Sequence, residues 1–241
     1  MAFVQNVPFF SIMLCMVCAI TSAMLKPKVA KGVTIGLSAA LCALNLWLTL
    51  FLKQQNLSYV YWMGHFPAPW GNELRAGPLE ALLAVCFSLV VLLSMLGGMQ
   101  KLGQQVDDKK QNLFCVMLDL TLAAMMAMLY TNDLFTGYVF IEIMTLAACA
   151  LIMSRQNGRT LVSAMRYMVM SLLGSGLTLI AITLTYNLTG HLLMENIHES
   201  LMELHQSGQY ETPITVIIGL FFVGLGIKSA LFPFHTWLPD S

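Results

Sequence analysis

Seven apolar runs, each about twenty residues long, follow one another along the chain and constrain its fold more than any other feature. They cover residues 7–25, 33–52, 78–96, 113–130, 134–153, 164–187 and 213–232. A helix that crosses a bilayer needs about 20 apolar residues, and its backbone polar groups must be paired within the segment. Because no run alternates between apolar and polar residues, we predict an all-α polytopic membrane protein without strands.

The composition agrees with this prediction. Only 10% of the residues are charged and 58% are hydrophobic, whereas a soluble domain has about 25% charged residues. Such a chain cannot cover itself with a polar surface, so lipid is its expected solvent. The formal net charge is zero, and we expect no nucleic-acid partner. The start, MAFVQN, lacks a positively charged segment and a cleavage site, so we expect the first helix to be retained.

The basic residues predict the orientation, because cytoplasmic loops of membrane proteins are enriched in Lys and Arg. Alternate connections contain most of them: Lys26, Lys28, Lys31, Lys101, Lys109, Lys110, Arg155 and Arg159. The opposite connections contain Lys53 and Arg75. We therefore predict a protein of the cell inner (plasma) membrane, with its N-terminus outside and its last residues near the cytoplasmic side.

Two connections on the predicted outer side are long. Residues 53–77 are rich in Tyr, Trp and Pro, and we expect them on the membrane interface, where aromatic rings settle. Residues 190–212 place apolar residues at helical spacing, which predicts a short amphipathic helix. His191, His198 and His205 recur there every seven residues, about 10 Å apart on a helix, so no metal site is expected.

Four ionisable residues fall within the predicted spans: Asp119, Glu142, Arg166 and Lys228. A charge at the centre of a bilayer costs about 2.5–3.5 kcal/mol, so such residues persist by pairing, by facing water or by being neutral. If their helices pack together, Glu142 and Lys228 form a pair in which the protonation state of each depends on the other. This chemistry suits a proton relay. A static ion pair that only fixes helix packing is the alternative.

Arg166 and Asp119 are candidate supporting charges. Arg166 lies about one turn into its span, from where it can extend to the interface or reach a carboxylate. Asp119 lies about two turns into its span, and a hydrogen-bonded carboxylate near the interface is the simpler interpretation.

The seventh span is expected to break near Pro233, which has no N–H to donate to the carbonyl of Ser229. Broken helices at membrane depth are tolerated where they line protein or a wet cavity. Three glycines of this span can let a neighbouring helix approach closely: Gly219, Gly224 and Gly226. His235 follows the break, and histidine is the side chain suited to proton exchange near neutral pH. The predicted proton relay therefore consists of Glu142, Lys228 and His235.

Three stretches of the chain resemble signatures of one membrane-protein family. GIKSALFPFHTWLPDS (residues 226–241) closely resembles the seventh-helix signature of the antiporter-like subunits of complex I, which Mrp-type cation/proton antiporters and membrane-bound hydrogenases share. NDLFTGYVFIEIMTL (132–146) resembles the fifth-helix signature that contains the family's essential glutamate. AMRYMVMSLLGSG (164–176) resembles the sixth-helix pattern with its basic residue and its Gly/Ser packing face.

This resemblance implies roles for single residues. Glu142 corresponds to the glutamate that modulates the lysine, and Lys228 corresponds to the central proton-carrying lysine. Arg166 would lie near the glutamate, and His235 in the segment that leads toward the eighth helix. The resemblance implies no soluble active site and no bound cofactor in this subunit. It implies other membrane subunits as partners, with protons, or Na⁺ exchanged for protons, as the transported ions.

Family members usually have about twice as many spans, built from inverted repeats. We therefore expect residues 1–112 to form three N-terminal helices with an outer aromatic loop, and residues 113–241 to begin the proton-channel repeat with four helices. The expected chain is a fragment, or a split subunit whose C-terminal half is a separate partner chain.

The predicted function is proton translocation within a multi-subunit redox-driven pump or cation/proton antiporter. Two alternatives remain. One is a scaffold subunit that holds partners in the lipid without conducting ions. The other is an enzyme with a quinone site, of which the sequence shows no sign.

Overall fold

The computed structural model of the chain describes residues 2–55, 57–66, 71–107, 110–155, 157–208 and 210–237. Seven helices within these ranges are long and apolar enough to cross a membrane. They are α2 (Val7–Met24), α3 (Pro27–Gln55), α4 (Pro78–Gln105), α5 (Gln111–Tyr130), α6 (Leu134–Met153), α7 (Gly158–Thr189) and α9 (Glu211–Lys228). The prediction of a polytopic helical membrane protein is confirmed.

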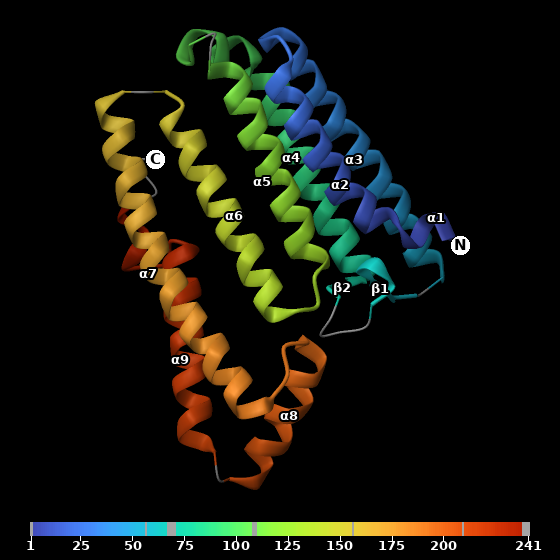
Figure 1. The fold of residues 1–241 in the computed structure, drawn as a ribbon, viewed down its shortest axis with the longest axis vertical. Helices are drawn as coiled ribbons and strands as arrows, with labels where there is room; N and C mark the ends of the chain where they lie inside the picture. Colours follow the sequence, from blue (N-terminus) through green and yellow to red (C-terminus); the bar gives the residue numbers. More distant parts are fainter. Residues whose placement is uncertain are drawn as a thin grey trace.

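Helices α2 to α5 form an N-terminal bundle, in which α3 packs against α4 and α2 packs against α5 (Figure 1). Leu41, Leu48, Leu122 and Tyr130 are fully buried in its core. A short helix, α1 (Ala2–Gln5), precedes it. Helix α6 packs against α5 and also against α7, and α9 packs along α7. The helices α6, α7 and α9 therefore form a second unit, the trio, which adjoins the bundle through α6 (Figure 1).

The first long connection contains two short strands, which the sequence did not predict. Strands β1 (Tyr59–Trp62) and β2 (Glu73–Ala76) pair antiparallel, with Tyr59 opposite Ala76, and a short 3₁₀ turn, η1 (Met63–His65), follows β1. Aromatic and β-branched residues favour strands, and the run YVYW alternates between half-buried and exposed side chains. Residues 67–70 of the predicted aromatic loop lie outside the described residues, and its place on the membrane interface stays a prediction.

The predicted amphipathic helix between the last two spans is confirmed as α8 (Met194–Ser207). Backbone hydrogen bonds connect its start to the turn between α5 and α6, because the Met194 N–H donates to the Asn132 carbonyl at 3.0 Å and the Leu134 N–H to the Leu192 carbonyl at 2.9 Å. The same turn is bonded to β2 through the Asn132 N–H and the Glu73 carbonyl at 2.9 Å. These bonds fix where α6 begins relative to both neighbouring connections.

Several helices extend beyond the predicted spans at the basic end of the molecule. Helix α3 begins at Pro27 and α7 at Gly158, and α4 continues to Gln105. The apolar runs define only the part of a helix that crosses hydrocarbon, while backbone hydrogen bonding continues into the interface, where Lys and Arg are solvated. Lys28, Lys101 and Arg159 therefore lie on helical turns rather than in loops.

The last span ends at Lys228, so the predicted break of this helix before Pro233 is confirmed. The device that ends it is a Schellman motif, in which the Leu231 N–H donates to the Gly226 carbonyl at 2.9 Å and the Ala230 N–H to the Ile227 carbonyl at 3.2 Å. Ala230 occupies the left-handed position, at φ 53°, that glycine usually takes. A 3₁₀ turn, η3 (Phe234–Trp237), follows.

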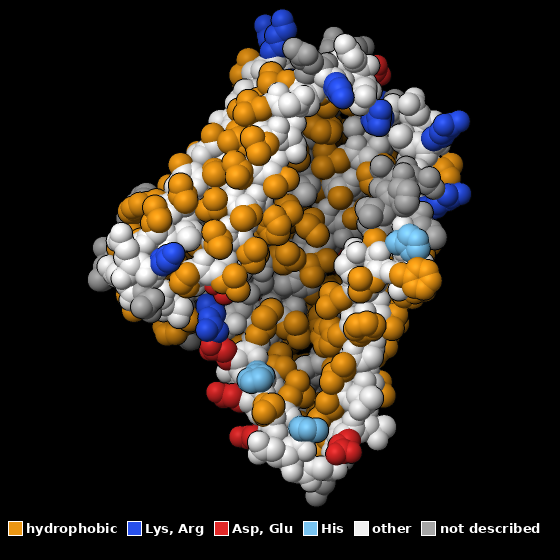
Figure 2. Space-filling model, turned by 180° about the vertical axis from the view of Figure 1, so that it is seen from behind, with side chains coloured by type: hydrophobic (Ala, Val, Ile, Leu, Met, Phe, Trp, Pro, Cys, Tyr) orange, Lys and Arg blue, Asp and Glu red, His pale blue; other side chains and the backbone are white. Residues whose placement is uncertain are grey.

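Charged side chains gather unevenly on the surface. Figure 2 shows most Lys and Arg side chains toward one end of the molecule, and most acidic side chains and two histidines toward the other. The acidic end contains α8, with Glu195, Glu199 and Glu203 on the helix. This separation agrees with the predicted orientation, which stays a prediction.

Candidate functional site: an ion pair between α6, α7 and α9

A close backbone contact between α7 and α9 positions the site. A Cβ atom added to Gly174 would lie 2.9 Å from the Gly224 carbonyl oxygen, and one added to Gly224 would lie 2.5 Å from Oγ1 of Thr178. Only glycine allows the two backbones to approach so closely. Of the three glycines expected to admit a neighbouring helix, Gly224 does so, whereas a Cβ added to Gly219 would meet nothing within 4 Å.

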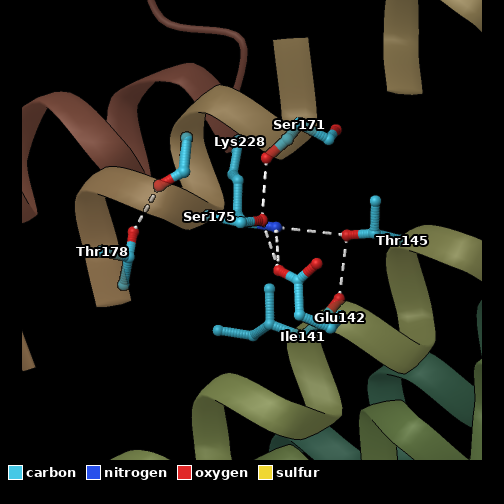
Figure 3. A network of polar contacts seen from close by, with 8 residues as sticks. Ile141, Glu142, Thr145, Ser171, Ser175, Thr178 and Lys228 are labelled. Carbon is cyan, nitrogen blue, oxygen red and sulfur yellow. Dashed lines mark hydrogen bonds and ion pairs between the residues drawn. The ribbon is translucent and has the colours of Figure 1, made fainter. Parts of the chain in front are cut away.

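Lys228 lies one turn after Gly224 and therefore on the same face of α9. From there its Nζ reaches Oε1 of Glu142 on α6, at 2.8 Å (Figure 3). The Lys228 side chain is 10% exposed and the Glu142 side chain 27% exposed. The structure thus brings together the two residues that the sequence paired, at a contact between three apolar helices.

Hydroxyl groups complete the site. Lys228 Nζ also donates to Thr145 Oγ1 at 3.3 Å, and the Thr145 hydroxyl donates to the Ile141 carbonyl at 2.8 Å (Figure 3). On the other side, the Ser175 hydroxyl faces both Glu142 Oε1 and the Ser171 carbonyl, the latter at 2.8 Å. A hydroxyl has one proton to donate. Ser175 can therefore donate to the carboxylate or to the backbone, but not to both at once.

Sequence reasoning did not select Ser175, Thr145 or Gly174. Ser175 and Gly174 lie in the run SLLGSG, whose small residues indicated a packing face but not a contact with Glu142. Thr145 follows Glu142 by three residues, which places both on one face of α6. Helical spacing from Glu142 was the signal that could have found Thr145.

The proximity of Arg166 to Glu142, which the resemblance implies, stays a prediction. Arg166 precedes Ser175 by nine residues on α7, about 13 Å along the helix axis at 1.5 Å per residue. Its side chain is exposed. The side chain of α7 that contacts Glu142 is Ser175.

His235 lies in η3, and its side chain is exposed. Its ring is stacked on Phe232, with the centroids 5.7 Å apart. Among the described residues no hydrogen bond joins His235 to the ion pair. Its part in a relay stays a prediction.

Asp119 has hydrogen-bond partners, and its expected place near the membrane interface stays a prediction. It is 0% exposed inside the N-terminal bundle, between α2, α3 and α5. One of its oxygens, Oδ2, accepts hydrogen bonds from the Ser22 and Thr34 hydroxyls, both at 3.2 Å. This carboxyl therefore belongs to a different set of helices from Glu142.

The side chains that meet at this site are an ion pair and hydroxyls. Within the described ranges, no three His, Cys, Asp or Glu side chains lie close enough together to hold a metal ion. The groups that converge are one carboxylate, one ammonium and hydroxyls that can reorient. The carboxylate accepts hydrogen bonds, the ammonium donates them, and each hydroxyl can do either.

The fold and this site define a polytopic membrane protein whose helices hold an ion pair of opposite charges. A family model described as the transmembrane region of NADH:quinone oxidoreductase and Mrp antiporter subunits matches residues 131–241. The NADH-quinone oxidoreductase subunit N of Desulforudis audaxviator (strain MP104C) is 36% identical over 182 residues, which are 75% of this chain and 35% of that protein. A Na⁺/H⁺ antiporter subunit of Bacillus subtilis (strain 168) is 30% identical over 194 residues, 80% of this chain and 37% of that one.

A solved structure shares the fold. A chain of the membrane-bound sulfane sulfur reductase, an archaeal respiratory membrane complex, superposes with a TM-score of 0.84 at 23% identity, over 98% of this chain and 47% of that one. The chain thus belongs to the family of antiporter-like membrane subunits that NADH-quinone oxidoreductases and Mrp antiporters share. It spans between about a third and half the length of these relatives.

Proposed function

We propose that this chain conducts protons as one membrane subunit of a larger redox-driven or antiport assembly, with Glu142 and Lys228 as the relay. The observation that supports this proposal is the 2.8 Å contact between Lys228 Nζ and Glu142 Oε1 at a contact between apolar helices. The names of its relatives, an NADH-quinone oxidoreductase subunit and a Na⁺/H⁺ antiporter subunit, agree with it.

The geometry gives the relay a physical basis. An ammonium in surroundings of low polarity is stable when a carboxylate compensates its charge. If Glu142 turns away, the partner that Lys228 keeps among the described residues is a neutral hydroxyl, Thr145 Oγ1 at 3.3 Å. Release of a proton then removes the uncompensated charge. The Ser175 hydroxyl can donate to Glu142 or to the Ser171 carbonyl. It would stabilise the Glu142 carboxylate while it donates to it, and would no longer do so once it donates to the Ser171 carbonyl.

The remaining parts of the proposal follow from the family and from the charge distribution. The basic end of the molecule faces the cytoplasm, with the N-terminus outside. Other membrane subunits, including a segment or chain that corresponds to the rest of the relatives' length, complete the path. The exchange of Na⁺ for protons is part of the proposal only where the assembly is an antiporter.

The test is proton uptake into inverted membrane vesicles that contain the native assembly. Lys228→Met should abolish uptake while the subunit stays in the assembly at wild-type abundance. Lys101→Met is the matched control, because Lys101 is an exposed lysine on α4, and it should leave uptake unchanged. Normal uptake with Lys228→Met would reject the relay. Loss of the subunit from the assembly would instead favour the scaffold alternative.

A further inference from the structure

Asp119 is the one described side chain in which a fully buried carboxylate oxygen has no hydrogen-bond partner. The residue is 0% exposed. Its Oδ2 accepts from two neutral hydroxyls, Ser22 on α2 and Thr34 on α3, both at 3.2 Å, whereas Oδ1 accepts from no group within the described residues. The proposed relay makes no use of this group.

The titratable groups around Asp119 give it no compensating cation. Helix α2 contributes Cys15 and Cys18, and α5 itself contributes Cys115, all near enough to interact electrostatically with the carboxyl. Lys31 of α3 interacts with Cys115, and no ion pair joins it to Asp119 in the described part of the chain.

The other two neighbouring helices do not supply a cation either. The charged residues of α4 are Glu80 in its first turn and Lys101 in its last turns, both far along the helix from its middle. Helix α6 contributes Glu142, which faces α7 and α9 through its contacts with Ser175 and Lys228.

An ionised carboxylate is an acceptor-only group with about four lone-pair sites. Burial of this charge costs free energy when no cation is near and only one of the two oxygens accepts hydrogen bonds. The neutral acid avoids most of that cost. The two hydroxyl bonds, both longer than usual for O–H···O, are weak compensation for a full charge.

We propose that Asp119 is a proton-binding site in the N-terminal bundle, occupied at neutral pH, so that the side chain is a carboxylic acid. The proton resides on Oδ1, the oxygen that accepts no hydrogen bond. The chain then contains two intramembrane carboxyl groups in different surroundings. Glu142 is paired with Lys228, whereas Asp119 is held by hydroxyls. This inference stands on the geometry of the bundle and does not depend on proton conduction through the trio.

The test is infrared spectroscopy of the purified native assembly at neutral pH, with aspartate labelled with ¹³C at the side-chain carboxyl. A protonated carboxyl gives a C=O band that shifts to lower frequency in the labelled protein and in D₂O. We expect Asp119→Asn to remove one such band. Asp133→Asn is the matched control, because Asp133 is an N-cap at the start of α6 whose side chain accepts from the Thr136 N–H, outside the buried site of Asp119. It should leave the band in place.

An identical band in the wild type and in Asp119→Asn would overturn the proposal, as would loss of the band on adding Na⁺ at constant pH. Asn has nearly the shape of the neutral acid and no charge, so Asp119→Asn should also assemble at wild-type abundance. If this variant does not assemble, the wild-type protein still decides, because the absence of a C=O band from labelled aspartate at neutral pH would equally reject a neutral Asp119. Glu142→Gln should leave the band unchanged, which separates this result from any failure of the proposed relay.

Discussion

The N-terminal bundle and the trio bury polar groups in different ways. In the bundle, Asp119, Asn45 and Tyr130 are all 0% exposed, and their hydrogen-bond partners within the described residues are neutral. In the trio, the charged pair of Glu142 and Lys228 retains side-chain exposures of 27% and 10%. The bundle has a large apolar core and a second, smaller cluster of Ala30, Met95 and Cys115, whereas the described part of the trio has a small buried cluster of Cys149, Ala164 and Tyr167.

This difference teaches what each region can do. Neutral hydrogen bonds inside a dense core stabilise one arrangement of helices, because leaving a buried polar group unpaired is costly. In the trio, the opposite charges are partly exposed and lie beside hydroxyls that can reorient. We expect these charges to change partners at a lower cost in free energy than buried groups of the bundle. We therefore expect changes in the bundle to alter stability and changes in the trio to alter transport.

The largest effect is expected where the trio depends on a close backbone contact. Gly224→Leu places a bulky side chain where a Cβ alone would lie 2.5 Å from Thr178 Oγ1 and 2.9 Å from the Gly174 carbonyl. Overpacking of this kind costs about 1–3 kcal/mol or more, and here it also separates α9 from α7. Proton uptake should be lost and the abundance of the assembled subunit should fall.

Gly219→Leu is the matched control, because nothing lies within 4 Å of its added Cβ. It should retain both uptake and abundance. If the two variants behave alike, the glycine contact does not position Lys228.

The next effect tests the hydroxyl at the ion pair. Ser175→Ala removes a donor to Glu142. A hydrogen bond to a charged group contributes about 1.5–3 kcal/mol, so the rate of proton uptake should fall about tenfold or more with little change in abundance. Thr183→Ala, which removes a hydroxyl that bonds only within α7, to the Leu179 carbonyl, should leave the rate unchanged. Equal rates in both variants would contradict a role for Ser175 beside the carboxylate.

In the bundle we expect a smaller effect, on stability and not on the rate of proton uptake. Tyr130→Phe removes the hydroxyl that donates to Asn45 Oδ1 at 2.7 Å and leaves that acceptor buried without a partner. The expected loss is about 1–3 kcal/mol of stability, with the uptake per assembled subunit unchanged. Thermal unfolding of the purified assembly measures the loss, and Tyr186→Phe, at an exposed tyrosine, is the control. Slower uptake per assembled Tyr130→Phe subunit would contradict the expectation that changes in the bundle alter stability but not transport.

The smallest effect concerns the hairpin at the end of the bundle. Tyr59 donates to the Val4 carbonyl at 2.9 Å, and burial raises the pKa of its phenol above the ordinary value. Because the folded-state pKa is the higher one, the stability from the neutral phenol is complete below about pH 10 and is lost as the pH rises further. Tyr59→Phe should therefore cost about 1 kcal/mol at neutral pH.

The difference in thermal stability between the wild type and Tyr59→Phe should shrink above about pH 10. Tyr61→Phe on the same strand serves as the comparison. A difference that stays constant up to high pH would show that the Tyr59 hydroxyl is not buried in the assembled protein.

Much of the fold could be predicted because the membrane imposes simple conditions on the sequence. Apolar runs of sufficient length identified the seven helices, and α6 was predicted with the boundaries that it has, Leu134–Met153. The hairpin was missed because its strands are only four residues each, too short for the alternation in YVYW to stand out among the apolar runs. The boundary at Lys228 depends on Ala230 in a left-handed conformation, which residue type does not predict.

The candidate site was predictable in part. Charged residues are rare in apolar spans and need a partner there, so Glu142 and Lys228 were identified as candidate site residues. The same reasoning also identified Arg166, which the structure places about 13 Å along α7 from Ser175. The burial of Asp119 among α2, α3 and α5 could not be foreseen, because the depth of a residue in its span does not reveal which neighbours surround it.

The sequence by itself determined that the chain crosses the membrane seven times and that it contains few charges, each of which requires compensation. Only the tertiary structure decided which charge is compensated by which group. The physical reason is that helical periodicity sets the face on which a side chain lies, while helix packing sets what that face meets. The contact of Gly174 with Gly224 brings Lys228 to Glu142, which Ser175 also contacts. The packing of α2 and α3 on α5 gives Asp119 hydroxyls as its hydrogen-bond partners within the described residues.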